Sequence, residues 1–430
     1  MNIALMTNNY KPFLGGVPIS VERLANALRA EGHSVTVFAP TYEGQEEEAG
    51  VFRYSTLMKH FIGGVVLPNP FDKHIEEEFR RQSFDVIHVH HPMLIGQMAV
   101  YLARKYEIPL TFTYHTRYEE YLSYFKGIRA MEGWADKEKH LFGPLSEHIL
   151  FLLKEVLIPR YMHGFMKHCD RIFAPTEGIL EYLHNHCQID YERLDILPTG
   201  IEECHFQVPE QEKEALRAKY NATDCPLLLS VSRMAHEKNV DFLIRSVALA
   251  KEKMLQKESF TPFRVLLVGD GPDRAKYEAL RDQLHVTEEI LFAGSVPNRE
   301  IAAYYAAADA FLFASKTETQ GIVILEAFAG ATPVYAVDAS GVRDLVKEGV
   351  NGRLFDEELE DFADGIIELV HKSEMLAGMA EGAYQTALQY REKTVARRAV
   401  SGYTYVCQHK KSSCGIMDAG LFMHRVANGI

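Results

Sequence analysis

Two glutamates stand eight positions apart in the stretch SKTETQGIVILEA, which runs from Ser315 to Ala327. Glu318 lies among polar, turn-forming residues, whereas Glu326 lies in an apolar run. We expect Gly321 to begin a helix whose first N–H groups are available to a phosphate. A carboxylate inside an apolar stretch needs hydrogen-bond donors, or it becomes neutral. The two hydroxyls of a ribose would supply donors to Glu326, and a sugar hydroxyl would supply one to Glu318.

Two cations, Arg233 and Lys238, follow the strand-like run PLLLSVS in the stretch SVSRMAHEKN. An arginine fork and a lysine point charge at one strand end could hold a diphosphate. Taken alone, such a pair is more often a pair of solvated loop charges. Taken together with Glu318 and Glu326, the cations complete a set of groups that one nucleotide sugar would satisfy.

Two glycine-rich turns and one histidine also follow strand-like runs. Gly16, in YKPFLGGVPIS, and the segment VGDGPDR each precede a predicted helix, where a backbone can approach an anion closely. Both are equally consistent with ordinary tight turns, and the dinucleotide fingerprint GxGxxG does not occur at the first turn. His115, in FTYHTRYEEY, could contact a substrate hydroxyl or a departing phosphate, or it could be a satisfied histidine at a domain edge.

The stretch HVHHP adds His88, His90 and His91 at a neighbouring strand end. Alternation along a strand would direct the first two to one face and His91 to the other. A histidine cluster can bind a metal, but no cysteine or carboxylate stands at ligand spacing here. We therefore expect no metal site.

The elements that must position these residues alternate between short apolar runs and amphipathic helical stretches. This pattern indicates parallel strands buried on both faces and covered by helices. The pattern restarts after about residue 222, so we predict two Rossmann-like, doubly wound domains with a cleft between them. The predicted N-terminal domain spans 1–205 with a helical insertion at 116–168, and the C-terminal domain spans 206–385. Residues 386–430 would form a helix that packs back on the N-terminal domain, followed by a tail, 408–430, without a clear period.

The composition limits the class of function. The chain has 430 residues, a net charge of −13 and a pI of about 5.8, which argues against a nucleic-acid binder. Six scattered cysteines without a CxxC pair suit a reduced compartment. No apolar run reaches the ~18–20 residues of a membrane span, and the first residues enter a strand-like run directly. We therefore expect a cytoplasmic protein.

The combination of these motifs in this order resembles the retaining glycosyltransferases of the GT-B fold, family four. The resemblance covers roughly residues 1–400. It implies two Rossmann-like domains, with the nucleotide sugar held mostly by the C-terminal one. It also implies catalysis without a metal or other cofactor, by front-face attack in which the leaving phosphate helps to deprotonate the acceptor. No protein nucleophile is then required.

The resemblance assigns a role to each candidate residue. It places the ribose on Glu326 and the diphosphate on Arg233 and Lys238, where the two cations would stabilise the charge of the leaving group. It implies that Glu318 and the backbone of Gly321 and Ile322 contact the donor sugar and phosphates. It also implies that Gly16 contacts the diphosphate and that His115 contacts the donor sugar and reaction centre. The backbone around Val296 would contact the base.

A narrower likeness concerns the acceptor. The stretches YHTRYEEY and SKTETQGIVILEA look like the HTxYE(D/E)Y and ETQG stretches of bacterial diacylglycerol glucosyltransferases, whereas many relatives that use sugar phosphates carry Phe-Gly in place of Gln320-Gly321. Residues 121–171 hold eight Lys or Arg against six Asp or Glu, so this apolar-rich insertion could lie on anionic lipid at the inner face of the cell membrane, or it could be a lid packed on its own domain.

We therefore predict transfer of a hexose, with UDP-glucose as the expected donor, to a lipid such as 1,2-diacylglycerol. The acidic balance departs from the strongly basic N-terminal domain that membrane-bound relatives often have. A soluble sugar, sugar phosphate or metabolite as acceptor is the first alternative. A nucleotide-sugar-binding protein or a dinucleotide oxidoreductase without transferase activity is the second.

Overall fold

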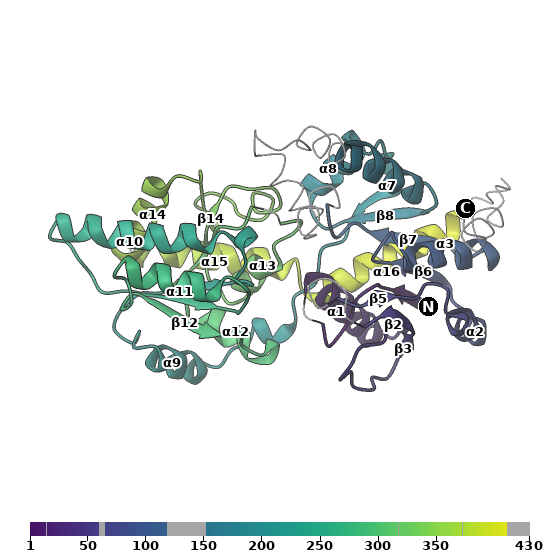
Figure 1. The fold of residues 1–430 in the computed structure, drawn as a ribbon, viewed down its shortest axis with the longest axis horizontal. Helices are drawn as coiled ribbons and strands as arrows, with labels where there is room; N and C mark the ends of the chain where they lie inside the picture. The colour runs from purple at the N-terminus through teal and green to yellow at the C-terminus, as the bar shows by residue number, and fades with distance from the viewer. Residues whose placement is uncertain (14, 60–64, 118–151, 317, 372, 411–430) are drawn as a thin grey trace, which may run out of the picture. The chain divides into compact units, whose positions relative to one another are not determined.

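The computed structural model describes residues 1–13, 15–59, 65–117, 152–316, 318–371 and 373–410 (Figure 1). The chain divides into two compact units. Unit 1 comprises the described residues of Met1–Pro175, Leu180–Leu197 and Ala396–Ile430, and unit 2 comprises those of Thr176–Ile179 and Pro198–Val395. Most of the insertion predicted at 116–168, and the tail beyond residue 410, lie outside the described residues.

Unit 1 is built on a parallel sheet with the strand order β3-β2-β1-β6-β7-β8-β9. Its chain order reverses beside β1, as in a doubly wound sheet. A short antiparallel pair, β4 and β5, stands apart from it. The strands are β1 (Asn2–Met6), β2 (Ser34–Pro40), β3 (Val51–Tyr54), β4 (Thr56–Met58), β5 (Leu67–Pro68), β6 (Val86–Val89), β7 (Leu110–Thr113), β8 (Arg171–Ala174) and β9 (Leu194–Ile196).

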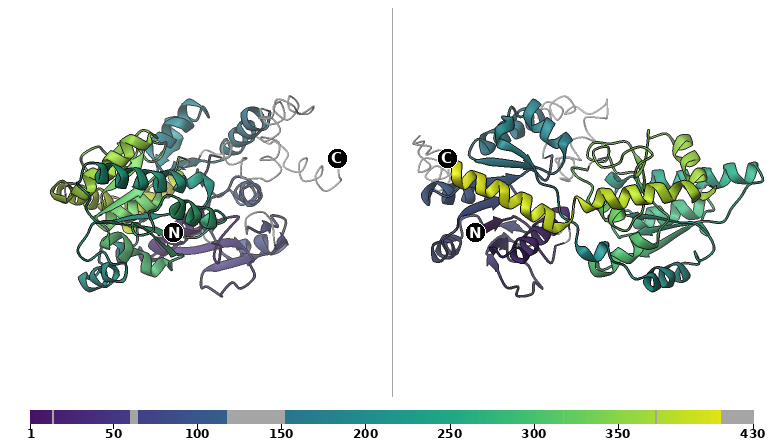
Figure 2. Two further views of the ribbon diagram at one scale, coloured as in Figure 1. Left: turned by 60° about the vertical axis from the view of Figure 1, so that its left-hand side comes forward. Right: turned by 180° about the vertical axis from the view of Figure 1, so that it is seen from behind.

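Helices pack against this sheet because its strands are apolar on both faces. Phe165 of α7 contacts Phe112 of β7, and Gly402 of α16 lies against the ring of Phe173 in β8. In Figure 2, α16 is the yellow helix that enters unit 1 at the C-terminal end of the described chain. The helices are α1 (Gly16–Ala30), α2 (Lys73–Arg81), α3 (Ile95–Lys105), the π-helix η3 (Leu152–Leu157), α7 (Ile158–Met166), α8 (Glu177–Asn185), the 3₁₀ turn η4 (Tyr191–Arg193) and α16 (Glu392–His409).

Unit 2 repeats the plan with a parallel sheet ordered β12-β11-β10-β13-β14-β15. Successive residues of a strand face opposite layers. Leu228 of β10 belongs to one apolar cluster, and Leu227 and Leu229 belong to the other. The strands are β10 (Leu227–Val231), β11 (Arg264–Val268), β12 (Ile290–Gly294), β13 (Ala310–Phe313), β14 (Val334–Val337) and β15 (Gly352–Phe355).

Each face of the unit 2 sheet carries its own set of helices (Figure 1). Helices α10 (Val240–Gln256), α11 (Arg274–Gln283) and α14 (Leu359–His371) pack on one face. Helices α9 (Glu210–Lys219), α12 (Asn298–Ala307) and α13 (Ile322–Ala329) pack on the other. Helix α15 (Ser373–Leu388) contributes to both clusters. The predicted fold class, with two doubly wound parallel sheets covered by helices, is confirmed.

The division between the units falls after Leu197, whereas the sequence placed the domain boundary between residues 205 and 206. The intervening residues belong to unit 2 because their polar groups bond there. Ile201 forms a parallel bridge with Arg391, and the backbone of Thr199 bonds to the side chain of Gln320. Residues up to Val395 also belong to unit 2, so the return of the chain to unit 1 falls within α16 and not at residue 386.

No helix in the described part of the chain combines the length and the apolar character that a membrane crossing requires.

Candidate functional site

Lys238 and Glu318 meet in unit 2, as their positions at strand ends predict. Strands β10 and β13 are neighbours, so the loops at their carboxyl ends lie side by side. Lys238, the last residue of the 3₁₀ turn η6 (His236–Lys238), places its Nζ 2.5 Å from Oε1 of Glu318. The Ser315 hydroxyl donates to the same oxygen at 2.7 Å. Burial alone would raise the pKa of Glu318, but the Lys238 ammonium and the Ser315 hydroxyl hold that pKa below its usual value.

Glu326 is buried within α13, with 6% of its surface exposed. The Tyr305 hydroxyl of α12 donates to its Oε2 at 2.9 Å, and Nε2 of His205, in the 3₁₀ turn η5 (Glu203–His205), lies 3.8 Å from its Oε1. The sequence predicted that this carboxylate needs hydrogen-bond donors, and the Tyr305 hydroxyl is one of them. Neither Tyr305 nor His205 was among the residues chosen from the sequence.

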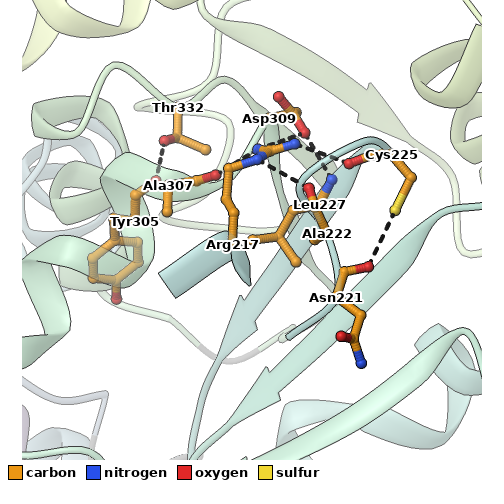
Figure 3. Close-up of polar contacts among 9 residues, drawn as sticks. All are labelled: Arg217, Asn221, Ala222, Cys225, Leu227, Tyr305, Ala307, Asp309 and Thr332. Atoms are coloured by element: carbon orange, nitrogen blue, oxygen red, sulfur yellow. Dashed lines mark hydrogen bonds and ion pairs between the residues drawn. The ribbon is translucent and has the colours of Figure 1, made fainter. Parts of the chain in front are cut away.

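Side chains that bond to backbone carbonyls hold the end of α12, where Tyr305 lies (Figure 3). The Tyr305 carbonyl accepts from the Thr332 hydroxyl at 2.6 Å. Close by, the Arg217 guanidinium binds the Asp309 carboxylate at 3.1 Å, and the same carboxylate accepts from the Leu227 N–H at 2.7 Å. The end of α12 is thereby fixed to the start of β10. Arg217 also donates to the carbonyls of Ala222, Cys225 and Ala307.

Gly321 stands before α13 in the left-handed conformation, with φ at 71°. The helix begins at Ile322, one residue later than the sequence predicted, and Gly321 is its N-cap. A Cβ at Gly321 would lie 3.0 Å from the Ile324 side chain, so both the backbone angle and the space favour glycine. Gly341 also has a positive φ, of 79°, and packs against the carbonyl of Glu318 so closely that a Cβ there would collide with it. The loop that carries Glu318 is therefore supported from two sides.

Arg233 follows β10 as predicted, but it is more exposed than Lys238. Its side chain is 56% exposed, and its guanidinium pairs with Glu237 at 2.5 Å. The glycines of VGDGPDR pack on this loop, because a Cβ at Gly271 would collide with the Met234 carbonyl. These glycines therefore allow two protein loops to approach each other closely. This agrees with the ordinary tight turn that the sequence analysis gave as the alternative to an anion-binding turn.

Gln320 points into the protein and binds the segment that enters unit 2. Its Oε1 accepts from the Thr199 N–H at 2.8 Å, and its Nε2 lies 3.4 Å from the Thr199 carbonyl. The side chain that distinguishes this loop from the Phe-Gly type thus has a partner in the backbone. Val296, which follows β12, is half-buried at the edge of one apolar cluster of unit 2.

The two remaining candidates lie in unit 1. Gly16 is the first residue of α1, after Gly15 in an extended conformation. His115 is half-buried just beyond β7, and its Nε2 lies 2.9 Å from Nδ1 of His90. Behind them, His88 bonds through Nδ1 to the Tyr403 hydroxyl at 2.6 Å. Both nitrogens of His88 and one nitrogen of His90 thus have hydrogen-bond partners within unit 1.

Among the described residues, one group of side chains has the spacing of metal ligands, and it is not the histidine cluster. Ligand atoms of Glu202, Cys204 and His205 lie within 4.8 Å of one another. Cys204 is exposed, whereas His205 is buried beside Glu326. The sequence did not single out this group, because its three residues are nearly consecutive in a turn.

The buried histidines should make unit 1 unstable in acid. Burial lowers the pKa of His88 and of His91 to about 3, while the unfolded chain titrates near about 6.5. Between these values the unfolded state binds protons that the folded state excludes, so stability is complete above about pH 6.5 and falls as the pH decreases. We expect the two residues together to lower the free energy of unfolding by about 2 kcal/mol between pH 6.5 and 5.5.

Urea unfolding followed by hydrogen exchange of the unit 1 strands measures this change. His88→Gln should reduce this change by about 1 kcal/mol over the same pH interval, which is the contribution of one site. A free energy of unfolding that does not change, or that rises, as the pH falls from 6.5 to 5.5 would contradict the account.

Two parallel doubly wound sheets, with Lys238 and Glu318 meeting at strand ends of the second and Glu326 buried in the helix that follows, fit a sugar-transferring enzyme of the GT-B class. Residues 14–203 match the family described as Glycosyltransferase Family 4, and residues 212–386 match Glycosyl transferases group 1. The chain belongs to the family-four GT-B glycosyltransferases, and it is a glycosyltransferase of the retaining type.

Individual relatives are similar over most of their length. The alpha-monoglucosyldiacylglycerol synthase of Streptococcus pneumoniae is 29% identical, over 86% of this chain and 78% of its own. The enzyme of the same name from Acholeplasma laidlawii is 26% identical, over 94% and 96%. A GDP-mannose-dependent alpha-mannosyltransferase of Mycolicibacterium smegmatis is 29% identical, over 83% and 84%. Anabaena HepE, solved with UDP, shares the fold with a TM-score of 0.69 at 16% identity, over 94% of this chain and 100% of its own.

Proposed function

We propose that this enzyme transfers glucose from UDP-glucose, with retention of configuration, to a membrane lipid such as 1,2-diacylglycerol. The part of this proposal that concerns the sugar donor rests on the cluster at the start of α13. Lys238 and Glu318 meet there, just before the helix that contains the buried Glu326. The acceptor half is supported by the two synthases of monoglucosyldiacylglycerol named above and by the HTRYEEY and ETQG stretches.

Each residue then has a chemical task. Glu326 accepts hydrogen bonds from the ribose, and Glu318 accepts one from a sugar hydroxyl. Lys238 and Arg233 face the diphosphate and stabilise the charge that develops as it leaves. The N–H groups at Gly321 and Ile322 add partial positive charge at the start of the helix. We propose no metal or other cofactor, because in this scheme the two cations neutralise the leaving group.

The other site residues complete the proposal. Gly16 allows the backbone of unit 1 to approach the diphosphate, His115 contacts the donor sugar, and the backbone around Val296 reads the base. The attacking hydroxyl of the acceptor loses its proton to the departing phosphate, so no side chain forms a covalent intermediate.

Exposed apolar side chains in unit 1 support peripheral contact with a membrane. Val156 and Leu157 of η3 are 41% and 55% exposed, and Leu57 and Met58 of β4 are 57% and 50% exposed. The cation Arg160 is exposed one turn beyond Leu157. Apolar residues beside a cation can bind an anionic lipid surface without a spanning helix. We propose that the protein acts at the inner face of the cell membrane.

Incubation with labelled UDP-glucose and vesicles that contain diacylglycerol tests this function. We expect label in the lipid fraction, in alkali-stable α-glucosyl linkage, and flotation of the protein with vesicles that also carry an anionic lipid. Vesicles without diacylglycerol are the control. Label transferred to a soluble acceptor, with the protein left at the bottom of the gradient, would refute the lipid acceptor.

A soluble acceptor is the second candidate, and the net charge of −13 favours it. Some relatives are named D-inositol 3-phosphate glycosyltransferases, and the acceptor in that name is a soluble sugar-like phosphate. The family assignment sets aside the third reading, a binding protein or oxidoreductase without transferase activity.

A further inference from the structure

The imidazole of His90 lies directly behind that of His115. Strands β6 and β7 are neighbours, so the residues that follow them at the carboxyl end lie side by side. Nδ1 of His90 is 2.9 Å from Nε2 of His115, and the rings are stacked with centroids 5.2 Å apart. His90 is 1% exposed, whereas His115 is half-buried. The pair therefore runs from the core of unit 1 toward its surface.

The ring of His90 is held from its other side. The ring of His88 packs against it in a tilted arrangement, with ring centroids 4.3 Å apart. Both nitrogens of His88 are engaged, by the Tyr403 hydroxyl at 2.6 Å and by the Thr113 hydroxyl at 2.7 Å. Because His88 is fixed by two bonds, His90 cannot turn without disturbing buried contacts.

The hydrogen bond between His90 and His115 contains one proton, and its direction follows from the far side of His90. Burial lowers the pKa of both residues well below the usual value, so both rings are neutral. Nε2 of His90 is buried and has no partner among the residues that the structure describes. A buried N–H without an acceptor is rarer than a buried acceptor without a donor. The proton of His90 is thus on Nδ1, which donates to Nε2 of His115.

We propose that His90 is a positioning residue that holds His115 in the tautomer with its proton on Nδ1. His115 then acts toward the substrate as a hydrogen-bond donor at that atom, suited to an oxygen of the sugar or of the leaving phosphate, and not as a base. This inference rests on the contact between His115 and the substrate proposed above. It extends the site by one buried residue that does not itself touch the substrate.

The test combines a spectroscopic and a kinetic readout on the full chain. Nitrogen-15 labelling of the histidines and long-range proton–nitrogen spectra identify the protonated nitrogen of His115, with His115→Ala used for assignment. We expect Nδ1–H in the wild type. His90→Leu, which removes the donor, should release this tautomer and lower kcat by about 10- to 100-fold with little change in KM for the donor.

Two further variants separate positioning from packing. His90→Asn carries an amide N–H close to where Nδ1 stood, and it should retain the tautomer and at least a third of the activity. Tyr54→Phe removes a different buried hydrogen bond of unit 1, from the Tyr54 hydroxyl to the Thr7 carbonyl at 2.7 Å, so it should lower the melting temperature while leaving the tautomer and kcat unchanged.

Two results would overturn the proposal. One is a proton on Nε2 of His115 in the wild type. The other is an unchanged tautomer in His90→Leu, together with equal losses of activity in His90→Leu and His90→Asn. The spectra need no substrate, so a wrong choice of donor or acceptor would abolish the kinetic readout while leaving the tautomer measurement intact.

Discussion

Replacing Glu326 with glutamine should weaken the binding of UDP by about 10- to 150-fold. The estimate follows from the loss of a charged hydrogen-bond acceptor, which contributes about 1.5–3 kcal/mol. Glutamine keeps the size of the side chain in α13, so the apolar surroundings remain filled. The amide cannot accept from the two ribose hydroxyls and from the Tyr305 hydroxyl together. Isothermal titration with UDP measures the change.

The ribose contact can be read directly with a modified nucleotide. Wild type should bind UDP more tightly than its 2′-deoxy or 3′-deoxy form, and Glu326→Gln should lose most of that preference. Glu289→Gln is the matched control, because Glu289 is also a buried carboxylate of unit 2, paired with Lys251 at 2.9 Å. That variant should lose stability and keep the UDP affinity. Equal affinities of wild type and Glu326→Gln for UDP would remove Glu326 from the site.

Replacing Lys238 with methionine should lower kcat by about 10²- to 10³-fold, which is the usual effect of removing one group that stabilises transition-state charge. Lys238 is the cation that the structure places against Glu318, and its side chain is 23% exposed. The loss should appear in kcat more than in KM, because charge on the diphosphate grows as the glycosidic bond breaks. Steady-state kinetics with UDP-glucose measure the two constants.

This variant also leaves Glu318 without its partner, which should cost up to about 3 kcal/mol of stability. The double variant Lys238→Met, Glu318→Gln removes that unpaired charge. It should regain the stability and not the activity. Lys316→Met is the control for a nearby surface lysine, since Lys316 pairs with Glu357 on the exposed surface, and it should leave kcat unchanged. If the double variant recovered activity with stability, Lys238 would have a purely structural function.

The short apolar runs predicted the fold because buried parallel strands have a distinctive composition. Each run chosen from the sequence contains a strand of one of the two sheets, and the runs are NIALMT, SVTVFAP, DVIHVHH, PLTFTYH and RIFAPT in unit 1 and PLLLSVS, FRVLLVGDG, EILFAGS, AFLFAS and TPVYAV in unit 2. Within the two parallel sheets, the strands that were not predicted are β3, β9 and β15, which lie at sheet edges, where polar residues dilute the composition of a strand. The short antiparallel pair β4 and β5 was not predicted either. The boundary at residues 205 and 206 differed from the observed one because proline and polar clusters do not reveal which unit a segment bonds to.

The site was predictable only where its residues follow adjacent strands. Lys238 and Glu318 are eighty positions apart, and the neighbouring order of β10 and β13 brings them together. Tyr305 and His205 could not be found in the same way. A tyrosine in an apolar helix has the pattern of a core residue, and its bond to Glu326 depends on how α12 and α13 pack.

Gln320 has a structural contact that the sequence did not predict. Its amide was taken as a sign of the acceptor class, yet both of its polar atoms face the backbone of Thr199. It acts on the shape of the loop that carries Glu318.

The crystal structure of the enzyme with bound UDP tests the central claim most directly. The account predicts that the ribose hydroxyls lie about 3 Å from the Glu326 carboxylate and that the diphosphate lies between Lys238 and the start of α13. UDP bound at another place in unit 2, with Glu326 still bonded only to protein groups, would contradict it.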